Sequence, residues 1–280
     1  MERLREEGLG IATISYDSTE ILSGFGRANN ISFPMLSDVG SATIRSYGIL
    51  NTVVATALAS TNMDPELKAQ VERYVTGAEP GERHLGIPFP GTFVVDTQGR
   101  VTSRFMEDSY TERTTISNIM VKTGIGEAPV QGTKVSTDHL EITAYPSDAA
   151  ISRRNHFSLV LEITPRPGMH VYAPGAEGYR VISLELAPQS FVTPSSLTFP
   201  ESEIYHFEPL DERVPVYQKP FKLLQEVVLE AEPDGADSVT VTGTLEYQAC
   251  DDKVCYNPVS VPLSWTMSLR PRVGRVTPNP

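Results

Sequence analysis

The chain has 280 residues, a length typical of two domains of roughly 100–200 residues each. Its net charge of −12, from 23 basic and 35 acidic residues, repels phosphate backbones and argues against general nucleic-acid binding. No apolar run approaches the ~18 residues that a membrane-spanning helix needs, and the first residues lack the apolar stretch of a signal peptide. The only cysteines are Cys250 and Cys255, which excludes a disulfide-rich scaffold and a zinc site made of four cysteines.

The first 125 residues alternate between strand-like and helix-like segments. Asp17 stands three residues before Glu20, and Ser109 stands three before Glu112, which is the spacing of a capping box at a helix start. This alternation predicts an α/β layer architecture. In chain order we expect a strand at 8–16, a helix at 17–29, an extended segment at 31–36, a helix ending at 47, a helix at 64–77, a hairpin of strands at 92–96 and 101–105, and a helix ending near 123.

From residue 139 onward short alternating segments follow one another, separated by turns rich in Pro, Gly, Ser and Asp, which predicts an antiparallel β-sandwich. The strands are expected at 140–145, 156–164, 170–172, 181–186, 221–230, 239–248 and 259–269. We therefore expect an α/β domain at 1–123, a glycine-rich linker at 124–137, an all-β domain at 138–271 and a tail at 272–280.

The two cysteines lie at facing ends of two expected strands. Cys250 ends one strand, Cys255 begins the next, and 251–254 can form a four-residue hairpin loop, so the Cα atoms would lie within the ~4.4–6.8 Å that a disulfide requires. A structural staple over so short a ring would add only ~2 kcal/mol. A metal site would need His170 and His206 to converge without a supporting motif. The spacing alone leaves a structural disulfide and a reversible redox pair both open.

Four segments of the first half, Ile14–Ser18, Phe33–Asp38, Tyr47–Ile49 and Phe89–Asp96, resemble the AhpC/TSA (peroxiredoxin) and thioredoxin-like redoxin families in order and spacing, over about 4–123. The resemblance implies a thioredoxin-like fold, with Pro90 at the position of the family's cis proline. The family's first strand and cysteine motif have no counterpart here, which we interpret as a truncated or degenerate domain. We expect no peroxidase activity from this chain.

In the second half, Leu245–Cys250 with Cys255–Pro258, Gly168–Tyr172 and Val216–Lys219 resemble the N-terminal domain of the thiol:disulfide interchange protein DsbD, over roughly 138–268. The loop between the cysteines has four residues, where the best-known members have five. The resemblance implies an immunoglobulin-like domain in the periplasm or another extracytoplasmic space. Its cysteine pair would exchange electrons with thioredoxin-like partners, without a cofactor or a metal.

The resemblance also suggests which residues surround the pair. A cap loop would shield the sulfurs with Leu210, or with Phe207 as the other candidate, while Tyr247 and Tyr256 flank the pair. The acidic loop between the cysteines should disfavour thiolates.

The sequence therefore predicts a partial thioredoxin-like α/β fold followed by an immunoglobulin-like β-sandwich, and the predicted function is thiol–disulfide exchange. The alternative is a non-catalytic β-sandwich binding module with a structural hairpin disulfide.

Overall fold

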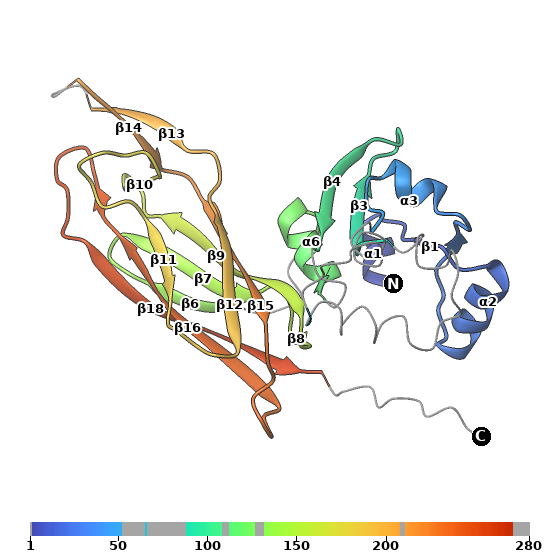
Figure 1. The fold of residues 1–280 in the computed structure, drawn as a ribbon. Helices are drawn as coiled ribbons and strands as arrows, with labels where there is room; N and C mark the ends of the chain where they lie inside the picture. Colours follow the sequence, from blue (N-terminus) through green and yellow to red (C-terminus); the bar gives the residue numbers. More distant parts are fainter. Residues whose placement is uncertain are drawn as a thin grey trace. The chain divides into compact units, whose positions relative to one another are not determined.

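The computed structural model describes residues 2–51, 65, 88–107, 112–126, 132–207 and 211–270, and the chain divides into two compact units at 1–112 and 113–280 (Figure 1). Each unit is considered by itself. Within the described part of the chain, no helix is both long enough and apolar enough to cross a membrane. The α/β character of the first unit and the all-β sandwich of the second match the predicted fold class.

The first unit begins with alternating helices and strands. Strand β1 is shorter than the expected strand at 8–16 and pairs in parallel with β2, with Ile14 opposite Leu36. Helix α2 confirms the predicted helix, but its N-cap is Ser18 rather than Asp17, since the Ser18 hydroxyl accepts the Ile21 N–H at 3.4 Å. The bounds are α1 (Glu2–Glu6), β1 (Thr13–Ser15), α2 (Thr19–Ala28), β2 (Met35–Ser37) and α3 (Ala42–Ser46).

The predicted hairpin of the first unit is present as β3 (Gly91–Val95) and β4 (Val101–Met106), paired antiparallel. Its turn is closed by the Asp96 carboxylate, which accepts the N–H groups of Gln98 and Arg100 at 2.9 Å each. The predicted helix at 64–77 lies outside the described residues except for Pro65.

The expectation of a cis bond at Pro90 is wrong, because no peptide bond among the described residues is cis. The chain there runs straight into β3, with the Phe89 N–H donating to the Ile49 carbonyl and the Pro90 carbonyl accepting from Glu107. The trans form is the more stable isomer of an X–Pro bond, and these hydrogen bonds are made in it.

The second unit is a β-sandwich of two main sheets (Figure 1). One sheet has the strand order β12-β15-β9-β7-β6, with β5 pairing to β9, and the other has the order β11-β16-β18-β8. The strands of these sheets are β5 (Arg113–Thr114), β6 (Thr133–Ser136), β7 (Leu140–Pro146), β8 (Ala150–Ile151), β9 (Asn155–Pro165), β11 (Ser183–Leu186), β12 (Val192–Thr198), β15 (Phe221–Leu229), β16 (Ser238–Tyr247) and β18 (Val259–Leu269).

Alternating apolar residues of the two sheets form the main core. On β9, Phe157, Leu159 and Leu161 are fully buried, and on β18 Trp265 is 1% exposed with its indole N–H 3.5 Å from the Val160 carbonyl. Buried and exposed positions alternate along β18, as the period-2 pattern of its sequence predicts, whereas residues 157–161 of β9 are buried on both faces. All seven expected strands are confirmed, and the bounds at 259–269 are matched at both ends. Strand β6 forms inside the expected linker at 124–137.

A third, smaller sheet extends from one end of the sandwich, where β13 and β14 project in Figure 1. Its strand order is β13-β14-β10-β17. The strands are β10 (His170–Tyr172), β13 (Glu203–Phe207), β14 (Glu212–Tyr217) and β17 (Ala249–Cys250). The expected strand at 170–172 is matched at both ends by β10, whereas β13 and β14 were not predicted.

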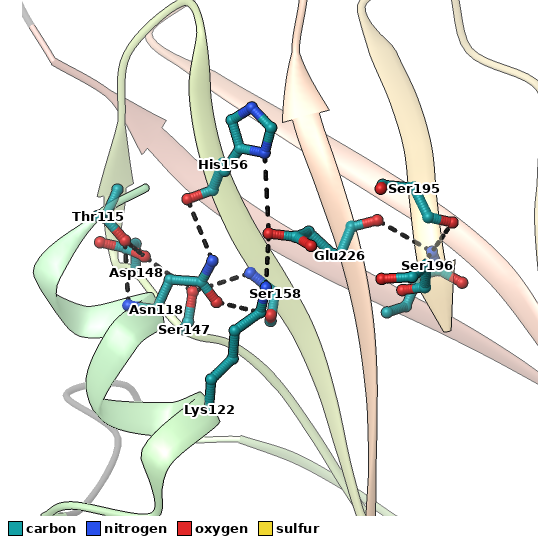
Figure 2. Close-up of polar contacts among 11 residues, drawn as sticks. Thr115, Asn118, Lys122, Ser147, Asp148, His156, Ser158, Ser195, Ser196 and Glu226 are labelled. Carbon is teal, nitrogen blue, oxygen red and sulfur yellow. Dashed lines mark hydrogen bonds and ion pairs between the residues drawn. The ribbon is translucent and has the colours of Figure 1, made fainter. Parts of the chain in front are cut away.

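Helix α6 (Ile116–Thr123) was expected to close the first domain, but it belongs to the second unit and packs on β9. Thr115 caps the helix by accepting the Asn118 N–H at 3.1 Å and donates to the Asp148 carboxylate at 2.6 Å (Figure 2). The Asn118 side chain, which is fully buried, accepts from the Ser158 hydroxyl at 2.6 Å and donates to the His156 carbonyl at 3.3 Å. Polar pairing of this kind fixes the helix in one register on the sheet.

At the end of α6 an ion pair joins the helix to β15. The Lys122 ammonium lies 2.6 Å from the Glu226 carboxylate, and the His156 Nδ1 lies 3.7 Å from the same oxygen (Figure 2). Burial opposes ionisation of Glu226, but the hydrogen bonds from His156 and Lys122 outweigh it and hold the pKa of this carboxyl at about 2.

Candidate functional site

The cysteines lie where the chain passes from the sandwich into the small sheet. Strand β16 ends at Tyr247 in the sheet with β18, and after Gln248 the chain continues as β17 beside β10. Cys250 thereby becomes the register partner of His170 on β10. The chain then turns back, and the Tyr256 N–H donates to the Ala249 carbonyl at 2.9 Å.

Asp251 organises the four-residue loop between the cysteines. One oxygen of its carboxylate accepts the N–H groups of Lys253 and Val254, each at 2.7 Å, and the other accepts the Tyr256 hydroxyl at 3.0 Å. Backbone hydrogen bonds from Lys253 and Val254 lower the pKa of Asp251 from its usual value. The predicted hairpin loop is confirmed, and its sequence explains the turn.

The loop holds Cys250 and Cys255 as an antiparallel bridge with a disulfide between them and 4.1 Å between their Cα atoms. The two sulfur-bearing residues differ in access to solvent, since Cys250 is 1% exposed and Cys255 is exposed. An attacking thiolate has to reach a sulfur atom along the S–S axis, so access decides which sulfur reacts. The arrangement offers one exposed cysteine, backed by one that is enclosed.

The hydroxyl group of Tyr172 contacts both sulfurs from the protein side. It lies 3.0 Å from the Cys250 Sγ and 3.4 Å from the Cys255 Sγ. Tyr172 is 3% exposed and shares a small apolar cluster with Val214, Val216 and Cys250. Burial raises the pKa of Tyr172, so the group beside the sulfurs is a neutral phenol.

Further aromatic rings enclose Tyr172. The ring of Tyr179 is stacked on it at a centroid distance of 4.0 Å, and the Tyr179 hydroxyl donates to the Glu212 carboxylate at 2.6 Å. The ring of His170 packs edge-on against Tyr172 at a centroid distance of 5.6 Å and lies 4.5 Å from the ring of Tyr205. Burial lowers the pKa of His170 although Asp252 and Asp251 act in the opposite direction, which favours the neutral imidazole.

The histidines considered for a metal site have other contacts. His170 lies among these aromatic rings, and the His206 Nε2 is 2.8 Å from the Asp211 carboxylate on an exposed turn. The two cysteine sulfurs are bonded to each other, so they do not act as thiolate ligands in this state.

The other predicted site residues are placed differently. Tyr256 borders the hairpin and, with His139 at 4.6 Å, lines a hollow of about 380 Å³. Tyr247 is fully buried in the main core, where its hydroxyl pairs with Thr137 at 2.8 Å. Phe207 is half-buried at the end of β13, opposite Glu212 in the ladder. Leu210 lies outside the described residues, and Pro90 belongs to the first unit.

Sequence reasoning missed Tyr179, Tyr205 and Glu212, and it considered His170 only as a metal ligand and Tyr172 only as part of a family segment. The segment Gly168–Tyr172 does carry a signal, an aromatic strand after a glycine, but this signal indicates a family likeness and not a contact to sulfur. No local pattern in the sequence marks Tyr179, which lies in the loop between β10 and β11, as a partner of Tyr172.

Comparison with known proteins gives two family matches. Residues 142–261 match the family model of the thiol:disulfide interchange protein DsbD, N-terminal, and residues 1–104 match that of the AhpC/TSA family. No curated protein matches the chain.

Among solved structures, the DsbD N-terminal domain of Neisseria meningitidis in the reduced form is 19% identical, over 40% of this chain and 81% of that one, with a TM-score of 0.28. The N-terminal periplasmic domain of ScsB from Proteus mirabilis is 17% identical, and the match covers 49% of this chain and 51% of that chain, with a TM-score of 0.33. The yeast GGA1 GAE domain is 13% identical, and the match covers 48% of this chain and 97% of that chain, with a TM-score of 0.29.

The family matches and the joined cysteines agree on one class of chemistry. The chain is similar to the AhpC/TSA family over 1–104 and to the DsbD N-terminal family over 142–261, and the joined cysteines lie within the second match.

Proposed function

We propose that Cys250 and Cys255 form a reversible redox pair that exchanges disulfides with thioredoxin-like partners. The observation that carries the proposal is the unequal exposure of the two cysteines, with Cys255 open to solvent and Cys250 enclosed beside the Tyr172 hydroxyl. A disulfide that serves only as a staple gains nothing from one accessible sulfur, whereas exchange requires it.

Reduction of the pair begins at Cys255. A thiolate of the partner attacks the Cys255 Sγ, the S–S bond to Cys250 breaks, and Cys250 leaves as a thiolate that takes up a proton. The second thiolate of the partner then attacks its own mixed-disulfide sulfur and releases Cys255. Two electrons pass from the partner dithiol, which becomes a disulfide, to the Cys250–Cys255 pair.

The reduced pair passes these electrons to a substrate by the reverse steps, at the same two sulfur atoms. The Cys255 thiolate attacks the disulfide of an oxidised substrate and forms a mixed disulfide, and Cys250 then attacks the Cys255 Sγ and releases the reduced substrate. In this scheme Cys255 contacts the outside molecule in both directions, and Cys250 resolves the intermediate.

We place this activity in the periplasm or another oxidising compartment, where protein disulfides persist and a reducible pair needs electrons. Residues 1–112 contain no cysteine, so this part of the chain supplies no thiol for peroxide reduction or for exchange.

The test is the reduction potential of the Cys250–Cys255 pair, measured by equilibration with glutathione or dithiothreitol buffers and quantified by thiol alkylation. We expect a value well above about −300 mV, in the range of pairs that are exchanged. A potential below about −300 mV would assign the disulfide to structure and would favour the binding-module alternative.

A further inference from the structure

A hollow of about 380 Å³ lies beside the hairpin that carries the cysteines, and the exchange scheme above does not use it. Its wall is built by the turn between β6 and β7, by the end of the loop before β10 and by the segment that follows Cys255. Because Tyr256 is the next residue after Cys255, the hollow borders the cysteine that is exposed. Its lining residues include Asp138, His139, Met169, Tyr256 and Pro258.

The aromatic part of this wall is held in place from several sides. The Tyr256 N–H donates to the Ala249 carbonyl at 2.9 Å, and the Tyr256 hydroxyl donates to the Asp251 carboxylate at 3.0 Å. The ring of His139 packs against that of Tyr256 at a centroid distance of 4.6 Å. A wall that is fixed before binding loses little conformational freedom when a ligand binds, which favours affinity. The hollow is therefore a preformed surface beside the exposed cysteine.

The charge and the apolar surface of the hollow favour a cationic side chain with a long aliphatic stem. The Asp138 carboxylate is exposed, and within the described residues it forms no hydrogen bond or ion pair. A guanidinium group can pair with a carboxylate and can also stack on an aromatic ring such as that of Tyr256. The methylene stem of an arginine can cover Met169 and Pro258. An apolar side chain would gain only these last contacts, and an acidic one would be repelled by Asp138.

Two basic residues of the chain lie close to this wall. The Arg166 N–H donates to the His139 carbonyl at 2.9 Å, but the Arg166 guanidinium is engaged with the Glu141 carboxylate at 2.6 Å. Lys253 lies on the loop between the cysteines, where two aspartates outnumber it. The Asp138 carboxylate is thus left for a cation that comes from another molecule.

We propose that the hollow binds an arginine side chain that flanks the exchanging cysteine of the polypeptide that reacts with Cys255. The guanidinium pairs with Asp138 and stacks on Tyr256, while the stem lies against Met169 and Pro258. Consecutive Cα atoms are about 3.8 Å apart, so a residue adjacent to the partner's cysteine stays within reach of a wall that begins one residue after Cys255. This inference rests on the proposed function and deepens it, because it names the feature by which the pair selects its partner.

The test is a competition between two peptide thiols for Cys255 in the Cys250→Ser variant, where a mixed disulfide cannot be resolved. The peptides are acetyl-Gly-Xaa-Cys-Xaa-Gly-amide, with Xaa as arginine in one and norleucine in the other. Each peptide thiolate attacks the mixed disulfide of the other at the Cys255 Sγ and releases it as a thiol, so the ratio at equilibrium reports the relative stability of the two mixed disulfides.

Intact-protein mass spectrometry measures this ratio at about pH 8, above the range in which histidine side chains ordinarily carry a charge. The same competition in denaturant gives the ratio that the peptides set by themselves. Relative to that ratio, we expect the folded protein to favour the arginine peptide about fivefold.

Two substitutions in the hollow should reduce the preference to about twofold. Asp138→Asn removes the carboxylate, and Tyr256→Leu removes the ring but keeps an apolar side chain. The matched controls should retain most of the preference. Asp252→Asn removes an equal charge from the cysteine loop, outside the lining of the hollow, and Tyr256→Phe keeps the ring and loses only the hydroxyl.

Three results would overturn the inference: a preference no larger than in denaturant, a preference for the norleucine peptide, or equal losses in Asp138→Asn and Asp252→Asn. The last would assign the preference to the overall acidity of the chain. The competition needs only a cysteine that forms mixed disulfides, so the inference can fail in a protein whose reduction potential supports exchange. A potential below about −300 mV would instead remove the proposed function and leave the peptide ratios measurable.

Discussion

A Cys250→Ser variant is expected to accumulate a stable mixed disulfide on Cys255, whereas a Cys255→Ser variant should react with external disulfides roughly a hundredfold more slowly. The reason is access, since Cys255 is exposed and Cys250 is 1% exposed beneath the Tyr172 cluster. In the wild-type protein the mixed disulfide should be transient, because Cys250 lies close enough to resolve it.

The measurement is intact-protein mass spectrometry after mixing each reduced protein with glutathione disulfide. The wild type should return to its own disulfide mass, and Cys250→Ser should retain one glutathione. Repeating the reaction in denaturant provides the control, because both variants should then react at similar rates. Equal rates for the two folded variants would contradict the assignment of Cys255 as the attacked and attacking residue.

The second large effect concerns stability. Lys122→Met should lower the free energy of unfolding of the second unit by about 1.5–3 kcal/mol, because it leaves the partly buried Glu226 carboxylate without its nearest cation. The matched control is Lys222→Met, which breaks an exposed pair with Glu162 on the same sheet and should cost at most about 1 kcal/mol. Urea unfolding at neutral pH compares the two.

The same pair gives a pH dependence with a defined sign. The pKa of Glu226 is about 2 in the folded protein, below its ordinary value of 4.5, so ionised Glu226 adds stability that is fully present above about pH 4.5. This contribution, of about 3 kcal/mol, is lost as the pH falls through 4.5 toward 2. Unfolding curves of wild type and Lys122→Met should therefore converge over this range, and a constant difference would contradict the assignment.

Much of the sandwich could be predicted because long strands such as β16 and β18 alternate between buried and more exposed positions. The 259–269 strand places Trp265 and Met267 inward with polar residues between them, which fixes both its face and its length. Strands β12 and β13 escape prediction because they have few buried residues, and β12 and β14 also contain a proline. Such strands are defined by their neighbours in the sheet and not by their own pattern.

The cysteine hairpin could be predicted from the spacing of the two cysteines alone, but the residues that pack around it could not. Tyr172, Tyr179 and Glu212 come together through a loop and two strands, and no local spacing records that contact. The placement of α6 failed for a related reason. Its caps at Thr115 and Gly124 specify that a helix forms, whereas the sheet on which it packs depends on Asn118 meeting Ser158.

The long ladder between β16 and β18 has a consequence for the reduced state. The pairing runs without interruption from Ser238 and Ser268 to Tyr247 and Val259, immediately before the segment that carries the cysteines. Breaking the sulfur bond leaves these hydrogen bonds in place, so the two thiols remain neighbours at a high effective molarity. Closing the ring again is then a unimolecular step, and the pair should store and release electrons two at a time.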